Sequence, residues 1–142
     1  MSLETNTQAI QQQDAPNINI TSLNIQTLKC DIKLANTIHV AKQLNIDILA
    51  LQEVRREGQK VLYFNKDDGE LDGWCITWSG FKRKGQVDVV FVLSPNVELI
   101  DHIYHLDGRI MSIIVVVKGM KLIVTNVYAP TDESSHSLKD LF

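Results

Sequence analysis

The side chains best placed for chemistry stand at the end of one apolar run. Residues Ile48 to Leu51 form an unbroken apolar stretch, and Gln52 and Glu53 follow it directly. An apolar run without alternation predicts a strand that is covered on both faces. Such a strand can present polar groups only where it leaves the sheet, and in mixed α/β proteins this carboxyl edge is where ligands are held. Glu53 is therefore the first candidate functional residue.

The segment before this run predicts the elements that position it. Residues 18–25 are rich in β-branched side chains, which predicts a first strand that ends near Asn24. Apolar residues then recur at helical spacing, at Ile32, Ala35, Ile38, Ala41 and Leu44. This spacing predicts a helix that Asp31 caps and that ends near Leu44. Strand, helix and strand form a βαβ unit with parallel strands, so we expect Asn24 and Glu53 at the same edge of the sheet.

The later elements are predicted from apolar segments and turn residues. The polar residues 54–73 predict mostly loop. Strands are then predicted over residues 74–79, 87–93, 97–106, 110–117 and 121–128. The last three are expected to form an antiparallel meander, and residues 131–142 begin a helical pattern. Asp88 interrupts an apolar strand, and we expect its carboxylate on a wet face or at an edge.

Length and composition are those of one globular domain. The chain has 142 residues, and its 44% hydrophobic content is ordinary for a protein with a packed core. The polar residues 1–17 predict a disordered tail ahead of a domain over residues 18–142. The net charge of −3 excludes a whole-molecule field that attracts nucleic acid, so phosphate contacts must come from local groups. No apolar run could span a bilayer and no C-x-x-C spacing occurs, so we expect an intracellular protein of the nucleus or cytoplasm.

Four short motifs occur in one order along the chain and carry a resemblance to a known family. They are Leu23-Asn24-Ile25, Leu51-Gln52-Glu53, Gly108-Arg109-Ile110 and Asn126-Val127-Tyr128-Ala129-Pro130. Together they resemble the endonuclease/exonuclease/phosphatase superfamily. The sequence around Asn24 and Tyr128 is most similar to the endonuclease domains of LINE-type retrotransposons and to craniofacial-development-protein-2-like proteins.

The resemblance implies a fold, a metal and a set of site residues. The family fold is a four-layer α/β sandwich, and its members hydrolyse phosphoesters with Mg²⁺, for which Mn²⁺ can substitute. Glu53 matches the family's metal-binding glutamate. Asn24 matches a catalytic, phosphate-binding asparagine, and Tyr128 matches a catalytic tyrosine whose hydroxyl stays protonated near the scissile phosphate. Arg109 matches an arginine with either a structural or a phosphate-binding role.

The chain also departs from the family pattern. The family's Asp-x-Asn motif and its C-terminal Asp-His pair are both missing, and the resemblance covers about the first half of the family domain. We therefore expect an endonuclease-like fragment of retroelement origin, which acts on DNA only if completed and is inactive as it stands. The alternative is a non-catalytic binding module that pairs with a second chain, or with itself, through an uncovered sheet. Taken singly, each candidate residue also has a purely structural interpretation.

Overall fold

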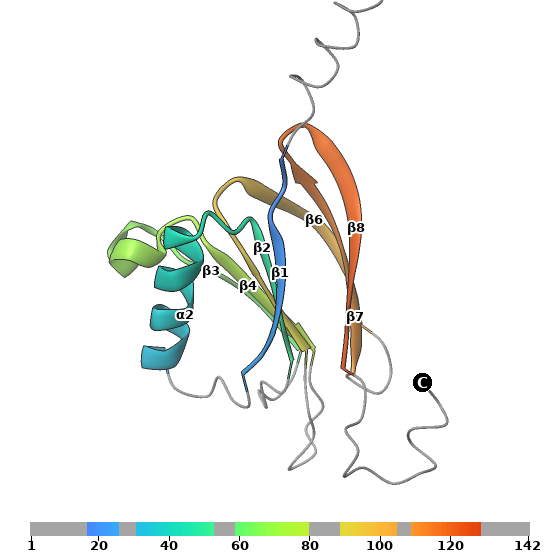
Figure 1. Ribbon diagram of the computed structural model, residues 1–142, viewed down its shortest axis with the longest axis horizontal. Helices are drawn as coiled ribbons and strands as arrows, with labels where there is room; N and C mark the ends of the chain where they lie inside the picture. The colour runs from blue at the N-terminus through green and yellow to red at the C-terminus, as the bar shows by residue number, and fades with distance from the viewer. Residues whose placement is uncertain (1–16, 26–30, 53–58, 80–88, 105–108, 129–142) are drawn as a thin grey trace, which may run out of the picture.

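Two β-sheets packed face to face, with one α-helix on the outside, make up the described part of the chain (Figure 1). The computed structural model describes residues 17–25, 31–52, 59–79, 89–104 and 109–128. Strands predominate over helices in these segments, and the protein is of the mixed α/β class. No helix in these segments is long and apolar enough to cross a membrane. Of the predicted polar tail, only Asn17 falls within the described residues.

The predicted βαβ unit is present. It consists of β1 (Ile20–Asn24), α2 (Asp31–Gln43) and β2 (Ile48–Gln52). The two strands are parallel, and their register brings the last residue of each strand side by side, Asn24 opposite Gln52. The predicted convergence of the two carboxyl ends is therefore confirmed as far as Gln52.

The end of α2 is set by a left-handed residue. Asn45 has φ of 55°, a conformation that asparagine tolerates better than most residues. The N–H of Ile46 donates to the carbonyl of Ala41 at 2.9 Å, and the N–H of Asn45 donates to that of Lys42 at 3.3 Å. This pair of bonds is a Schellman motif, which satisfies carbonyls that the helix itself leaves open. The chain then turns directly into β2.

Three further strands complete the first sheet. They are β3 (Gln59–Tyr63), β4 (Cys75–Ser79) and β5 (Val89–Leu93), and the strand order is β1-β2-β5-β4-β3. The pairs β2–β5, β5–β4 and β4–β3 are all antiparallel. The predictions for β4 and β5 are confirmed, and Asp88 lies outside the described residues.

The prediction of mostly loop over residues 54–73 is wrong. This segment contains β3 and the short 3₁₀ helix η1 (Lys66–Leu71). β3 lies at the sheet edge and pairs only with β4, so it can carry polar residues that hide the strand pattern. η1 begins with a capping box, in which Asn65 accepts a hydrogen bond from the N–H of Asp67 and donates its own N–H to the carboxylate of Asp68.

The second sheet is the predicted antiparallel meander. It consists of β6 (Val97–Tyr104), β7 (Ile110–Val117) and β8 (Met120–Val127), in that order. Lys118 and Gly119 join β7 to β8, with φ of 49° and 77°. Positive φ at both central positions is the two-residue hairpin turn that matches the twist of the strands. The predicted turn at residues 107–108 and the predicted helix at 131–142 lie outside the described residues.

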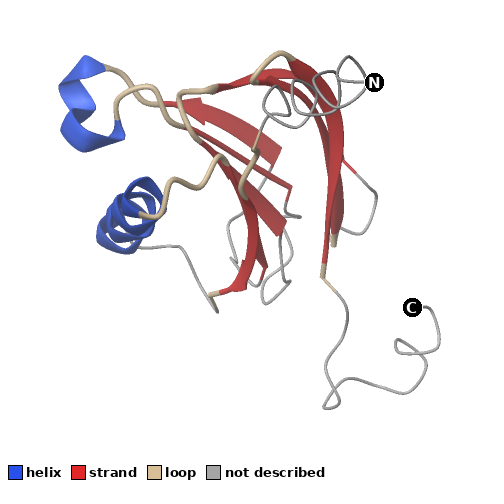
Figure 2. Ribbon diagram, turned by 45° about the horizontal axis from the view of Figure 1, so that its top comes forward, coloured by secondary structure: helices blue, strands red, loops and turns tan. Residues whose placement is uncertain are grey.

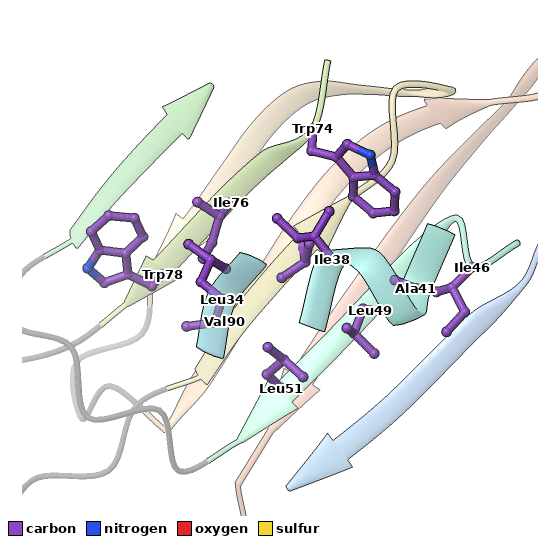
Figure 3. Close-up of a cluster of buried hydrophobic side chains, with 11 residues drawn as sticks. Leu34, Ile38, Ala41, Ile46, Leu49, Leu51, Trp74, Ile76, Trp78 and Val90 are labelled. Atoms are coloured by element: carbon purple, nitrogen blue, oxygen red, sulfur yellow. The ribbon is translucent and has the colours of Figure 1, made fainter. Parts of the chain in front are cut away.

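Strand β2 belongs to two hydrophobic cores at once. Leu49 and Leu51 face α2 and join the core shown in Figure 3, where Ile38 and Trp74 also lie. Ile48 and Ala50 face the other way, into the core between the two sheets. The prediction of a strand covered on both faces is therefore confirmed. α2 and η1 lie on the side of the first sheet that faces away from the second sheet, so the described residues form three layers (Figure 2).

Candidate functional site

The carboxyl ends of β1 and β2 form one edge of the first sheet. Asn24 and Gln52 are neighbours there, and the N–H of Ile25 donates to the carbonyl of Gln52 at 3.3 Å. Glu53 is the next residue of the chain and lies outside the described residues. The structure thus brings Asn24 to the end of the buried strand that precedes Glu53, and the side chain of Glu53 itself is not described.

The side chain of Gln52 is the centre of a polar network at this edge. Its Nε2 donates to Oδ1 of Asn126 at 2.8 Å and to Oγ of Ser22 at 2.9 Å. Its Nε2 also lies 3.3 Å from the carbonyl of Ala50. In the segments that the structure describes, Oε1 of Gln52 accepts no hydrogen bond. An amide oxygen is able to accept a hydrogen bond from water or to coordinate a cation.

Asn126 connects the two sheets at the same place. Its side chain is buried, and Nδ2 donates to the carbonyls of Leu51 at 3.0 Å and of Val90 at 2.9 Å. Its Oδ1 accepts from Gln52, so every polar atom of the amide has a partner. β8 is thereby fixed to β2 and β5, which belong to the other sheet.

Asn126 is a candidate that the sequence did not single out, and Gln52 was noted only beside Glu53, although both stand within the four motifs. A signal was present for Asn126. Alternation along β8 puts it on the same face as Leu122 and Val124, which pack against the core between the sheets. A polar side chain on a buried face must find partners. The identity of those partners, up to 75 residues away in sequence, could not be read from the motif.

Arg109 and Tyr128 are neighbours at the corresponding end of the second sheet. The N–H of Tyr128 donates to the carbonyl of Arg109 at 2.8 Å, one step beyond the last β7–β8 pair. Tyr128 also packs against the core between the sheets. It follows Asn126 by two residues, so the described residues of both motifs lie at the end of the sheet where Asn126 contacts Gln52. The four motifs therefore meet at one end of the two packed sheets.

The described part of this edge offers neutral oxygen ligands. No group of three or more His, Cys, Asp or Glu side chains that could hold a metal occurs within the described ranges. The amides of Asn24, Gln52 and Asn126 supply oxygen atoms without charge. Glu53, which the sequence predicts as the metal ligand, lies outside the described residues.

Cys75 is not a competing nucleophile. Burial raises the pKa of its thiol to about 11, and a hydrogen bond from Tyr63, its neighbour across β3 and β4, only partly counteracts this. At neutral pH the thiol therefore stays protonated, whereas both nucleophilic attack and metal binding need the thiolate.

A second polar region lies at the opposite end of the sheets. A cavity of about 440 Å³ is lined there by residues that include Asp47, Lys118 and Asn19. The buried carboxylate of Asp47 accepts from the N–H of Asn19 at 2.9 Å and pairs with Lys118 at 3.3 Å. These contacts tie the start of β2 to the β7–β8 turn. The carboxylate of Asp47 is thus already paired within the protein.

Comparison with known proteins yields no relative, because no protein-family model matches the chain and no curated protein sequence matches it significantly.

We predict that Asn126→Asp destabilises the protein by about 3–5 kcal/mol at neutral pH, because a buried carboxylate would face the two carbonyls to which Nδ2 now donates. Urea denaturation followed by circular dichroism measures the change. The matched control is Asn96→Asp, at an exposed position after β5, which should change the free energy of unfolding by less than about 0.5 kcal/mol. Equal effects of the two substitutions would contradict the bridging role of Asn126.

We also predict that Cys75 resists alkylation in the folded protein. A pKa of about 11 instead of the usual 9.0 lowers the thiolate fraction about a hundredfold at pH 8, and burial slows the reaction further. Iodoacetamide labelling of the Cys30→Ser variant, with and without urea, tests this. The pKa of the Cys75 thiol is higher in the folded protein than in the unfolded chain. Its contribution to the free energy of unfolding is therefore complete below pH 9 and is lost as the pH rises to about 11. Equal labelling rates in the two conditions would contradict the prediction.

Proposed function

We propose that this chain supplies one edge of a Mg²⁺-dependent phosphodiesterase site of the endonuclease type, with DNA as the substrate of the completed site. The observation that carries the proposal is the meeting of the four motifs at one end of the sheets. Gln52 and Asn126 are 74 residues apart and share a hydrogen bond. Asn24 pairs with Gln52, and Tyr128 directly follows β8. Motifs that arose by chance in the sequence would have no reason to converge in space.

The fold proposed for the whole domain is a four-layer α/β sandwich of the endonuclease/exonuclease/phosphatase type, of which this chain is about the first half. The three described layers, helix, sheet and sheet, support it. The fourth layer would cover the outer face of the β6–β8 sheet. This layer would have to come from outside the described residues.

The donor set of the edge fits a hard cation. Glu53 would hold Mg²⁺ with its carboxylate, and Oε1 of Gln52 is a second oxygen at the end of the same strand. Such oxygen ligands suit Mg²⁺, which keeps several waters and needs few protein ligands. When bound, the ion supplies polarisation of a phosphoryl oxygen and neutralises charge on the leaving group.

The remaining candidates act on the phosphate. The amide of Asn24 can donate a hydrogen bond to a phosphate oxygen beside Gln52. The phenol of Tyr128 is a proton donor at neutral pH, and Arg109 can contribute a charge-assisted hydrogen bond. Hydrogen-bond donors of this kind suit a phosphodiester, which is an anion.

A second candidate function is that of a non-catalytic interaction module. Exposed apolar side chains on the outer face of the β6–β8 sheet, among them Ile103 and Ile123, favour it. In such a module the hydrogen bonds between Gln52 and Asn126 would only hold the two sheets together. Metal binding and DNA cleavage separate the two functions.

We predict that Glu53 dominates the affinity for divalent cations. Glu53→Gln should lower Mn²⁺ or Mg²⁺ affinity by at least about tenfold, because it removes the one charged ligand proposed for the site. Titration calorimetry of wild type and variant measures the change. Glu70→Gln, at an exposed carboxylate on η1, is the control and should leave the affinity unchanged. Binding that survives Glu53→Gln would remove Glu53 from the site.

We further predict that the chain of residues 1–142 does not cleave DNA. In-line hydrolysis needs a group that deprotonates the water, and lack of such a base costs about 10²–10⁴-fold in rate, or roughly 3–5 kcal/mol of barrier. Of the histidines in the described ranges, His39 lies on α2 beside Glu70. His102 lies on β6 opposite Ile113, two residues before the end of the strand. Neither stands at a position that matches the family's histidine.

Nicking of supercoiled plasmid in Mg²⁺ or Mn²⁺ tests this prediction, with Glu53→Ala as the control for contaminating nucleases. Nicking by the wild type that the variant lacks would contradict it. The base would then have to come from a residue such as His136, which lies outside the described residues.

A further inference from the structure

The cavity at the end of the sheets opposite Gln52 is lined by two kinds of side chain. Its inner part is formed by buried residues, among them Trp74 and Ser94, which are 3% and 5% exposed. Its mouth carries exposed side chains, among them Lys42 and Asp72. The volume of about 440 Å³ lies within the range of small-molecule sites in proteins.

The indole N–H of Trp74 is a buried hydrogen-bond donor in the lining of this cavity. Its Nε1 makes no hydrogen bond to any residue that the structure describes, whereas a buried indole N–H usually has a partner. The nitrogen lies on the edge of the ring that is turned away from Ala41 and Leu49 of the core (Figure 3). The N–H therefore faces the cavity and needs an acceptor there. The hydroxyl of Ser94, which accepts from the N–H of Asn96 at 3.3 Å, can donate its own proton to the same acceptor.

Lys42 and Asp72 bring opposite charges to the mouth of the cavity. Lys42 lies in the last turn of α2, and Asp72 follows η1 directly. Neither side chain forms an ion pair or a hydrogen bond with another residue in the described segments. Lys118 and Asp47, the other charged pair of the lining, already neutralise each other. The mouth therefore presents one ammonium group and one carboxylate that are both available to a ligand.

The walls of the cavity are held in place by contacts between separate loops. The N–H of Ser94 donates to the carbonyl of Asp47 at 2.9 Å. Gly73, with φ of 83°, packs so closely against Pro95 that a Cβ at this glycine would lie 3.0 Å from the proline side chain. A ligand would therefore enter a cavity that is already formed, which lowers the cost of binding.

We propose that this cavity binds a small zwitterion of the free α-amino acid class. The carboxylate of the ligand accepts hydrogen bonds from the indole N–H of Trp74 and from the ammonium group of Lys42. The ammonium group of the ligand donates to the carboxylate of Asp72. An anion would leave Asp72 without a partner and would be repelled by it, and a cation would leave the N–H of Trp74 without an acceptor. Only a ligand with both charges satisfies all three groups.

The exposure of Lys42 and Asp72 limits the affinity, because water screens the charges that they contribute. We therefore expect dissociation constants in the millimolar range. The site lies at the other end of the sheets from Gln52 and is independent of the proposed phosphodiesterase function. Binding is measured without DNA and without divalent ions, so the failure of either proposal leaves the other untouched.

Proton–nitrogen correlation NMR of the full chain tests the binding, because the sequence contains only two tryptophans and each indole N–H gives its own signal. Titration with glycine or with L-glutamine should shift the Trp74 signal to saturation in the millimolar range. The signal of Trp78, which is buried in the core and does not line the cavity, should stay nearly unchanged. Trp74→Phe assigns the two signals. A Trp74 signal that does not shift, or that shifts without saturation, would overturn the proposal.

Acetate and methylammonium, which each carry one of the two charges, test the class of ligand. Each should bind at least about tenfold more weakly than glycine, because each leaves a charged or buried polar group of the cavity without its partner. Acetate that binds as tightly as glycine would overturn the zwitterion and make the cavity a site for anions.

Variants that remove one charge test the two groups at the mouth. Lys42→Gln and Asp72→Asn should each weaken glycine binding by about five- to tenfold, since each leaves one charge of the ligand unpaired. The matched controls Lys121→Gln and Asp101→Asn, at exposed positions of β8 and β6 outside the cavity, should leave binding unchanged. Circular dichroism melts verify that all four variants fold. Equal effects of the test and control variants would overturn the assigned contacts.

Discussion

Burial of β2 on both faces is the constraint on which the rest of the structure depends. Leu49 and Leu51 contact the helix layer, and Ile48 and Ala50 contact the second sheet, so the strand needs two separate covering layers. A strand of this kind has no position for a polar side chain until it leaves the sheet. The first polar side chain that this strand presents is therefore Gln52, at its carboxyl end.

Hydrogen bonds fix the polar groups that meet there. An amide left unpaired between two packed sheets would cost more free energy than a hydrogen bond contributes to stability. Asn126 satisfies all of its polar atoms with groups of the other sheet and of Gln52. This bridge orients the side chain of Gln52 so that its nitrogen donates to Asn126 and Ser22. The same amides thus fix the two sheets to each other at this edge.

The two sides of the β6–β8 sheet have opposite environments. Met111, Ile113, Val115 and Val117 are buried against the first sheet, while the alternate residues of β7 are only half-buried. Strands β6 and β8 are more exposed than β7 on the outer face, with isoleucines at positions that usually carry polar groups. This outer face and the edge that carries Gln52 lie on different parts of the fold.

Local periodicity in the sequence determined the doubly buried β2, the βαβ unit and the β6–β8 meander, because each of these elements is encoded by neighbouring residues. The same periodicity missed β3, since an edge strand with polar residues is stabilised chiefly by its pairing with β4. The sequence also determined which residues were candidates, Asn24, Glu53, Arg109 and Tyr128, through short motifs. Only the tertiary structure decided that β5 lies between β2 and β4, and that Asn126 joins Gln52 across the two sheets. Such contacts link residues far apart in the chain, and no local pattern specifies which strand a buried amide will meet.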